Sequence, residues 1–142
     1  MAGTEYLDHL SGIRLFSACN RKELQKIAKG SDELKVEAGK VLTEQGRSGH
    51  EAFVIVSGEA AVEVNGKRLA TLGPGAHFGE LALLDGQPRT ATVTATTDMT
   101  VLVISQREFF SLLDEVPGLA RKVLTTMAGM VRDLDQRLGT TH

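Results

Sequence analysis

Apolar and polar residues along this chain follow two different periods, and the change of period divides the sequence into three parts. In residues 1–30 apolar side chains such as Leu7 and Leu10 recur at helical spacing, and Asn20 is a candidate helix cap. From residue 31 to 104 the chain shows short β-type runs between glycine-containing turns. The pattern therefore predicts N-terminal helices followed by a β region.

Seven runs in the β region have the length and composition of strands. They cover residues 33–36, 41–44, 52–57, 60–64, 67–72, 90–95 and 99–104. Asn65-Gly66, between two of these runs, is a strong hairpin signal, because the tight turn needs positive φ at both central positions. Many short strands separated by turns indicate a sheet closed against itself, since open edges aggregate. We expect an α+β, mainly β fold built around a small antiparallel β-roll.

The last part of the sequence returns to helical spacing. Ser105, followed three residues later by Glu108, predicts a capping box at the start of one helix, which a Pro-Gly pair then ends. From residue 119 to 138 apolar side chains recur every three or four positions and predict a second, longer helix. Two C-terminal helices over 105–138 therefore follow the roll.

Length and composition indicate one globular domain and exclude several classes of function. The 142 residues carry a net charge of −2, and no Lys/Arg cluster exceeds a pair, so we expect no direct contact with nucleic acid. The longest apolar run, 53–56, is far shorter than the roughly 20 residues that cross a bilayer, so no membrane contact is expected. The single cysteine, Cys19, allows no internal disulfide and suits a cytoplasmic protein, where it would serve as a packing residue.

Glu80 and Arg89 stand nine positions apart among small and apolar residues, and this stretch has the character of a pocket. Buried ions need partners, because an unpaired charge loses several kcal/mol of hydration in a dry interior. One interpretation is a structural salt bridge between the two. The other is an anionic ligand with hydroxyl groups that lies between them, and the small residues around both charges favour it by leaving room.

The residues Phe-Gly-Glu-Leu-Ala-Leu-Leu at 78–84 and Pro-Arg-Thr-Ala-Thr-Val at 88–93 resemble the phosphate-binding cassette of the cyclic-nucleotide-binding domain family. Members of this type regulate the cAMP receptor protein and protein kinase A. The resemblance extends over about residues 10–135, through Gly39, Gly46, the strand 53–56 and the turn at 73–75. It implies one stand-alone domain over 1–142, with an eight-stranded roll, a cassette at 78–93 and no catalytic residue.

The resemblance also implies roles for individual residues. Glu80 matches the acid that accepts a hydrogen bond from the ribose 2′-hydroxyl, and Arg89 matches the arginine that pairs with the cyclic phosphate. The backbone N–H groups of Leu81, Ala82 and Ala91 would add donors at the start of a short helix, where the helix dipole also favours anions. The implied ligand-binding residues are Gly79, Glu80, Leu81, Ala82, Arg89, Thr90 and Ala91. The Thr90 hydroxyl can also bond a guanine amino group, so cGMP stays open, although cAMP is favoured.

The surroundings of the base are defined less specifically. Val62 and Leu69 match positions that line the base, but plain core packing explains them equally well, and Phe78 opens the cassette. The last helix matches the one that closes over the base. Its candidates for the cap are Met127, Met130, Val131, Arg132 and Leu134. Such an apolar stripe also suits core or dimer packing.

We therefore expect a cytoplasmic sensor, not an enzyme, in which a cyclic nucleotide repositions the helices over 105–138. The effector would be a separate protein, a second copy of this chain or a region outside it. One alternative is a cupin-like metalloenzyme, but His9, His50, His77 and His142 are scattered, and His77 reads as a turn residue at the pocket rim. Another is an interaction module that binds no ligand. We expect no metal and no cofactor besides the cyclic nucleotide itself.

Overall fold

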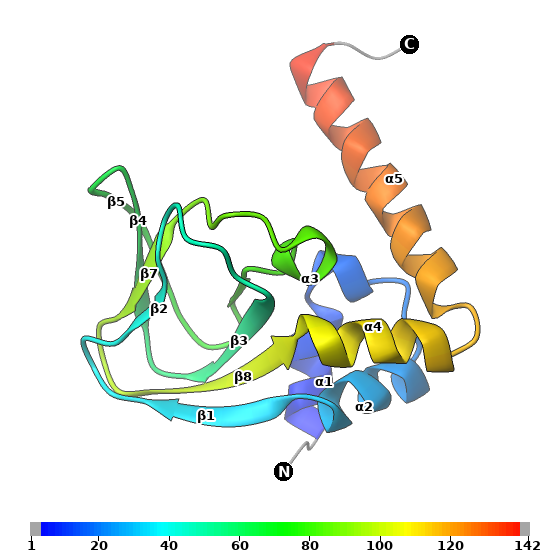
Figure 1. The fold of residues 1–142 in the computed structure, drawn as a ribbon, viewed down its shortest axis with the longest axis horizontal. Coiled ribbons are helices and arrows are strands. Elements are labelled where there is room, and N and C mark those ends of the chain that lie inside the picture. Colours follow the sequence, from blue (N-terminus) through cyan, green and yellow to red (C-terminus); the bar gives the residue numbers. More distant parts are fainter. Residues whose placement is uncertain (1–3, 140–142) are drawn as a thin grey trace.

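The computed structural model describes residues 4–139 and contains the three expected parts (Figure 1). The helices are α1 (Thr4–Ser11), the 3₁₀ helix η1 (Arg14–Phe16), α2 (Arg21–Lys29), α3 (Ala82–Asp85), α4 (Gln106–Glu115) and α5 (Leu119–Leu138). The strands are β1 (Asp32–Val36), β2 (Val41–Thr43), β3 (Glu51–Ser57), β4 (Ala60–Val64), β5 (Lys67–Leu72), β6 (His77–Phe78), β7 (Thr92–Ala95) and β8 (Met99–Ser105). The predicted α+β fold is confirmed. Strand β6 was not found from the pattern, because two residues are too short to show alternation.

The eight strands form two antiparallel sheets that face each other as a roll. Their orders are β1-β8-β3-β6 and β2-β7-β4-β5. Asn65 and Gly66 have φ values of 53° and 78°, which confirms the predicted tight turn between β4 and β5. Residues far apart in the sequence, such as those of β3 and β8, therefore lie side by side in one sheet.

Side-chain caps begin two of the helices. Asn20 accepts a hydrogen bond from the Glu23 N–H (2.9 Å), and the Glu23 carboxylate accepts one from the Asn20 N–H (2.8 Å). Ser105 accepts a bond from the Glu108 N–H (3.2 Å), but the reciprocal bond to the Glu108 side chain is not formed among the described residues. The predicted capping box at Ser105 is therefore wrong in its second bond, because the Glu108 carboxylate lies near Gly30, where an added Cβ would be 3.3 Å from Oε2.

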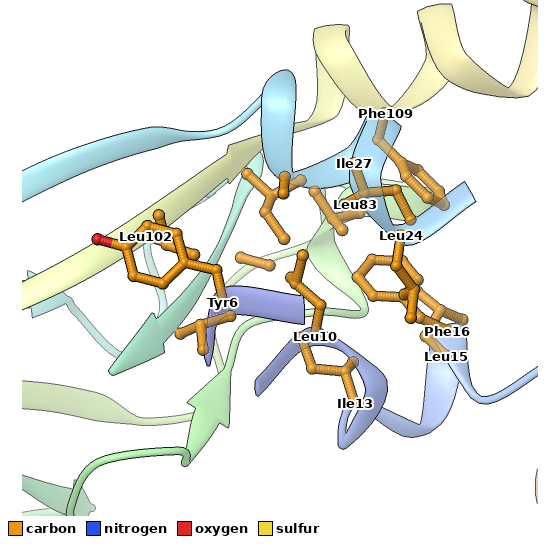
Figure 2. Close-up of a cluster of buried hydrophobic side chains, with 14 of the residues drawn as sticks. Tyr6, Leu10, Ile13, Leu15, Phe16, Leu24, Ile27, Leu83, Leu102 and Phe109 are labelled. Atoms are coloured by element: carbon orange, nitrogen blue, oxygen red, sulfur yellow. The ribbon is translucent and has the colours of Figure 1, made fainter. Parts of the chain in front are cut away.

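Two apolar clusters stabilise the domain. The roll core lies between the sheets and contains Phe53, Val93 and Val101. The helical core lies where the helices pack against β3 and β8, and Figure 2 shows it with Leu83 of α3 among the side chains of α1, α2 and α4. Leu83 is fully buried there, so the short helix α3 is attached to the helical side of the molecule.

Cys19 packs at the edge of the helical core, as expected of a packing residue. Burial raises the pKa of its thiol to about 11, the nearby Glu23 carboxylate acts in the same direction, and Lys122 opposes them. The thiol is therefore uncharged at neutral pH and carries little nucleophilic character.

Helix α5 projects away from the roll (Figure 1). Its first turns are anchored through Leu119 and Val123, which are buried, whereas the remaining length exposes a row of apolar side chains. The exposed members are Leu124, Val131, Leu134 and Leu138. Two ion pairs tie the helix to the N-terminal part, Lys122 Nζ to Glu23 Oε1 at 2.7 Å and Arg14 to Asp133. Across residues 4–139, no helix combines the length and the apolar character that crossing a membrane requires.

Candidate functional site

The cassette leaves one sheet at β6 and enters the other at β7. Phe78 lies opposite Phe53 of β3, and the two rings stack with their centroids 5.0 Å apart. Gly79 follows with a φ of 79°, a left-handed conformation that turns the chain out of the sheet at little steric cost to glycine. The chain then forms α3, and Pro88 returns it through an isolated bridge to Ser48. The cassette therefore starts from a strand that is held in place by the stacking of Phe78 on Phe53.

Two adjoining hollows lie along the cassette. The larger has a volume of about 210 Å³ and is lined by Gly79, Glu80, Leu81, Ala82, Asp85, Gln87, Pro88, Arg89 and Thr90. The smaller has a volume of about 110 Å³ and is lined by Thr43, Val62, Phe78, Gly79, Arg89, Thr90, Ala91 and Val93. The structure thus brings all seven predicted ligand-binding residues to one place. Gly79, Arg89 and Thr90 border both hollows.

The Arg89 guanidinium is the unusual group of the site. Its Nη1 atom is buried and has no hydrogen-bond partner among the described residues. Two glycines make room for it: a Cβ on Gly79 would lie 2.6 Å from Nη1, and a Cβ on Gly49 would overlap the guanidinium itself. Burial lowers the pKa of Arg89, while the charge of Glu51 opposes this shift. A buried donor without a partner suits an anionic oxygen arriving from the hollow.

The Glu80 carboxylate has a protein partner, and that partner is His77. Glu80 Oε2 lies 3.1 Å from His77 Nε2, with the two side chains 25% and 27% exposed. Hydrogen bonding from His77 lowers the pKa of Glu80, and burial opposes this effect. Within the described structure Glu80 and Arg89 form no ion pair with each other, so the structural salt bridge considered from the sequence is not the arrangement found.

The remaining predicted residues separate into two groups. Val62 and Phe78 line the smaller hollow and also pack against the roll core. Leu69 is 62% exposed and borders neither hollow, so the structure supports neither a core position nor a base contact for it. Arg132 is exposed on α5 and likewise lies outside both hollows.

One of the three predicted backbone donors is already in use. The Ala82 N–H donates to the Gly79 carbonyl (3.1 Å) in the turn that begins α3. A hydrogen already shared within the turn is a weaker donor to a ligand. Leu81 and Ala91 therefore stay the better candidates for additional backbone contacts.

Three features of the site were not found from the sequence. Gly49 has no local signal, because the side chain that it accommodates comes forty positions later. His77, expected as a turn residue, lies in β6 and pairs with Glu80; the spacing of three across a glycine was the available signal. Gln106, the first residue of α4, places its side-chain amide 3.4 and 3.3 Å from the carbonyl oxygens of Ala82 and Leu83.

The described residues offer no obvious metal site. Within residues 4–139 no three His, Cys, Asp or Glu side chains gather closely enough to hold an ion, and His142 lies outside this range. The cupin-like alternative therefore receives no support from the arrangement of side chains.

Comparison with known proteins agrees with this geometry. The sequence profile described as cyclic nucleotide-binding domain matches residues 33–116, more than half of the chain. The chain is 34% identical over 117 residues to a cAMP-dependent protein kinase regulatory subunit from Hypocrea atroviridis, covering 82% of this chain and 25% of that protein. It is 33% identical over 111 residues to a cyclic nucleotide-gated potassium channel from Mesorhizobium japonicum, covering 78% of this chain and 31% of the channel. The chain thus spans about a quarter to a third of the length of these relatives.

A solved structure supports the same assignment. The N-terminal domain of a transcriptional regulator from Streptomyces coelicolor A3(2) superposes with a TM-score of 0.84 at 27% identity, covering 91% of this chain and 96% of that one. The match spans the helices as well as the roll, because it includes nearly all described residues. This chain belongs to the cyclic nucleotide-binding domain family.

Proposed function

We propose that this chain is a cAMP sensor in which Arg89 binds the cyclic phosphate and Glu80 binds the ribose 2′-hydroxyl. The buried Arg89 Nη1 without a partner, bordering a hollow, is the observation that carries the proposal. A guanidinium fork suits two phosphate oxygens, and Leu81 and Ala91 offer further backbone donors nearby. The role is binding and not catalysis, and we place it in the cytoplasm, where a chain with a single, free cysteine keeps its thiol.

The preference for cAMP over cGMP rests on the relatives. Several of them, including the one from Hypocrea atroviridis, are named as regulatory subunits of cAMP-dependent protein kinase. Thr90 borders both hollows, and its hydroxyl offers an acceptor to a guanine amino group. We therefore expect measurable but weaker binding of cGMP.

Ligand binding would reposition α4 and α5. The cassette is joined to these helices through Leu83, which is buried in the helical core, and through Gln106 of α4. Beyond its first turns α5 exposes an apolar row that a moved helix could place over the base or against a partner. The partner would be an effector protein or the α5 helix of a second copy.

Isothermal titration calorimetry with cAMP and cGMP tests the binding proposal. Arg89→Ala should weaken cAMP binding by roughly 100-fold, about 3 kcal/mol, because a charge-assisted bond to the phosphate is lost. Arg47→Ala is the matched control, since this nearby arginine has a side chain that is 76% exposed. Absence of heat with both nucleotides at millimolar concentration, or equal affinity of Arg89→Ala and wild type, would contradict the proposal.

Hydrogen exchange of the helices tests the repositioning. At saturating cAMP, amide exchange in α4 and α5 should change relative to the free protein, whereas β8, which contributes residues to both cores, should exchange alike in both states. Unchanged exchange in α4 and α5 in a protein that binds cAMP would show that the helices do not respond.

A further inference from the structure

We infer that His77 is a positioning residue for ribose recognition: it holds one oxygen of the Glu80 carboxylate so that the other can accept the 2′-hydroxyl. The inference rests on the proposed function and adds a residue to it. Its observation is the 3.1 Å contact between His77 Nε2 and Glu80 Oε2, with both side chains largely but not fully covered. Glu80 lines the larger hollow, whereas His77 is not among the residues that line it, so the imidazole contacts the carboxylate without bordering the space for a ligand.

The two partners differ in how firmly their backbones are held. His77 lies in β6 opposite Val54 of β3, a residue with no exposed surface, and the stacked Phe53 and Phe78 rings fix the next pair along the strands. Glu80 lies beyond the left-handed Gly79, in the turn that leads into α3. The His77 contact therefore ties a carboxylate on a turn to a side chain on a sheet.

This tether matters because a free glutamate side chain populates several rotamers. Ordering such a side chain costs conformational entropy and opposes binding, whereas a side chain that is already ordered meets the ligand without that loss. A carboxylate has about four acceptor positions, so an imidazole on Oε2 leaves Oε1 available to a hydroxyl. His77 thus orients the Glu80 carboxylate through Oε2 and leaves Oε1 for the 2′-hydroxyl.

The phosphate end of the site is held by different means. The Arg89 guanidinium lies in the space left by Gly49 and Gly79, and within the described structure it forms no ion pair with another residue, while its Nη1 has no hydrogen-bond partner. Loss of the imidazole should therefore affect ligands that carry a 2′-hydroxyl and leave phosphate binding unchanged. This selectivity separates a positioning role from a general structural one.

Two substitutions at His77, each measured by calorimetry with cAMP and with 2′-deoxy-cAMP, test the inference. His77→Leu removes the donor at similar volume and should weaken cAMP binding about tenfold, with less than a twofold effect on 2′-deoxy-cAMP. His77→Gln keeps an N–H near the position of Nε2 and should restore cAMP affinity to near the wild-type value. In the Glu80→Gln background, His77→Leu should have no further effect on cAMP, because the carboxylate that it orients is gone.

The outcomes distinguish failure of this inference from failure of the proposed function on which it rests. Equal weakening of both ligands by His77→Leu, or unchanged cAMP affinity in this variant, would overturn the positioning role while the wild-type protein still binds cAMP. A wild-type protein that binds neither ligand would overturn the proposed function and this inference together. Thermal unfolding of each variant shows whether it is folded, and the ratio of the two affinities within one variant does not depend on the fraction of folded protein.

Discussion

The two halves of the cassette are anchored to different parts of the molecule. The first half, with Glu80, continues into α3, and Leu83 buries it in the helical core. The second half is held by backbone bonds to the loop between β2 and β3: the Arg89 N–H donates to Arg47 O and the Gly46 N–H donates to Arg89 O, both at 2.8 Å. A ligand that contacts Glu80 and Arg89 together therefore connects the helices to the roll, which gives binding a physical route to α4 and α5.

The largest expected effect comes from removing the anchor of the first half. Leu83→Ala should lower the free energy of unfolding by about 3 kcal/mol, because it leaves a cavity in the helical core. Leu81, two positions earlier and 52% exposed, is the matched control, and Leu81→Ala should stay within about 0.5 kcal/mol. Urea denaturation measures both, and similar values for the two variants would show that α3 is not anchored through Leu83.

Gly49→Ala tests the second half of the cassette, because it changes the position of Arg89 without altering Glu80 or α3. An added Cβ would overlap the Arg89 guanidinium and displace it from the hollow, so cAMP affinity should fall about 30-fold, near 2 kcal/mol. Gly73 is the control, because a Cβ there meets nothing within 4 Å and its φ is not positive. Calorimetry compares the variants, and equal affinity in Gly49→Ala and Gly73→Ala would mean that the observed position of Arg89 is not required.

Lys122→Met removes the ion pair between α5 and Glu23 of α2, in the helical part of the molecule. Burial raises the pKa of Glu23, but bonds from Lys122 and from the Asn20 N–H outweigh it, and the pKa lies below its ordinary value. Since this pKa is lowered by folding, the pair stabilises the protein above the ordinary glutamate pKa of about 4.3 and loses its effect as pH falls through the folded value. The variant should be about 1.5 kcal/mol less stable at pH 7, with a smaller difference at pH 3.

Denaturation at the two pH values measures this effect. Arg14→Ala is the control, because the Arg14 and Asp133 side chains are 46% and 44% exposed and such pairs contribute less than about 1 kcal/mol. A Lys122→Met variant with the same stability deficit at pH 3 and pH 7 would show that packing, and not the charge of Glu23, explains the loss.

The smallest effect concerns the link between the cassette and α4. Gln106→Ala removes two long hydrogen bonds to α3 and should lower the free energy of unfolding by only about 0.5 kcal/mol. Its informative readout is hydrogen exchange of α4 with saturating cAMP, where the change caused by the ligand should diminish. If cAMP changes the exchange of α4 as much in this variant as in the wild type, the cassette is connected to α4 through Leu83 and not through Gln106.

The helices and most of the strands were predictable from the sequence because their signals are local. The Asn20 cap and the Asn65-Gly66 turn depend on residues within a few positions, and both are present in the structure. The paired motif around Glu80 and Arg89 was likewise visible as a contiguous segment. In contrast, the surroundings of Arg89 were not predictable, since Gly49 and Glu51 approach it only after the roll has closed, whereas the His77 partner of Glu80 is only three positions away along the chain.

The sequence by itself determined the three-part architecture, the family and the two charges of the candidate site, because periodicity, caps, turns and a contiguous motif are short-range properties. Tertiary structure decided which groups surround these charges. It separated Glu80 from Arg89, placed His77 beside one and two glycines beside the other, and left Leu69 in solvent. It also set the apolar row of α5 facing outward. Apart from the contact between His77 and Glu80, which are three positions apart, these features depend on contacts between distant segments, and the spacing of residues along a chain does not specify them.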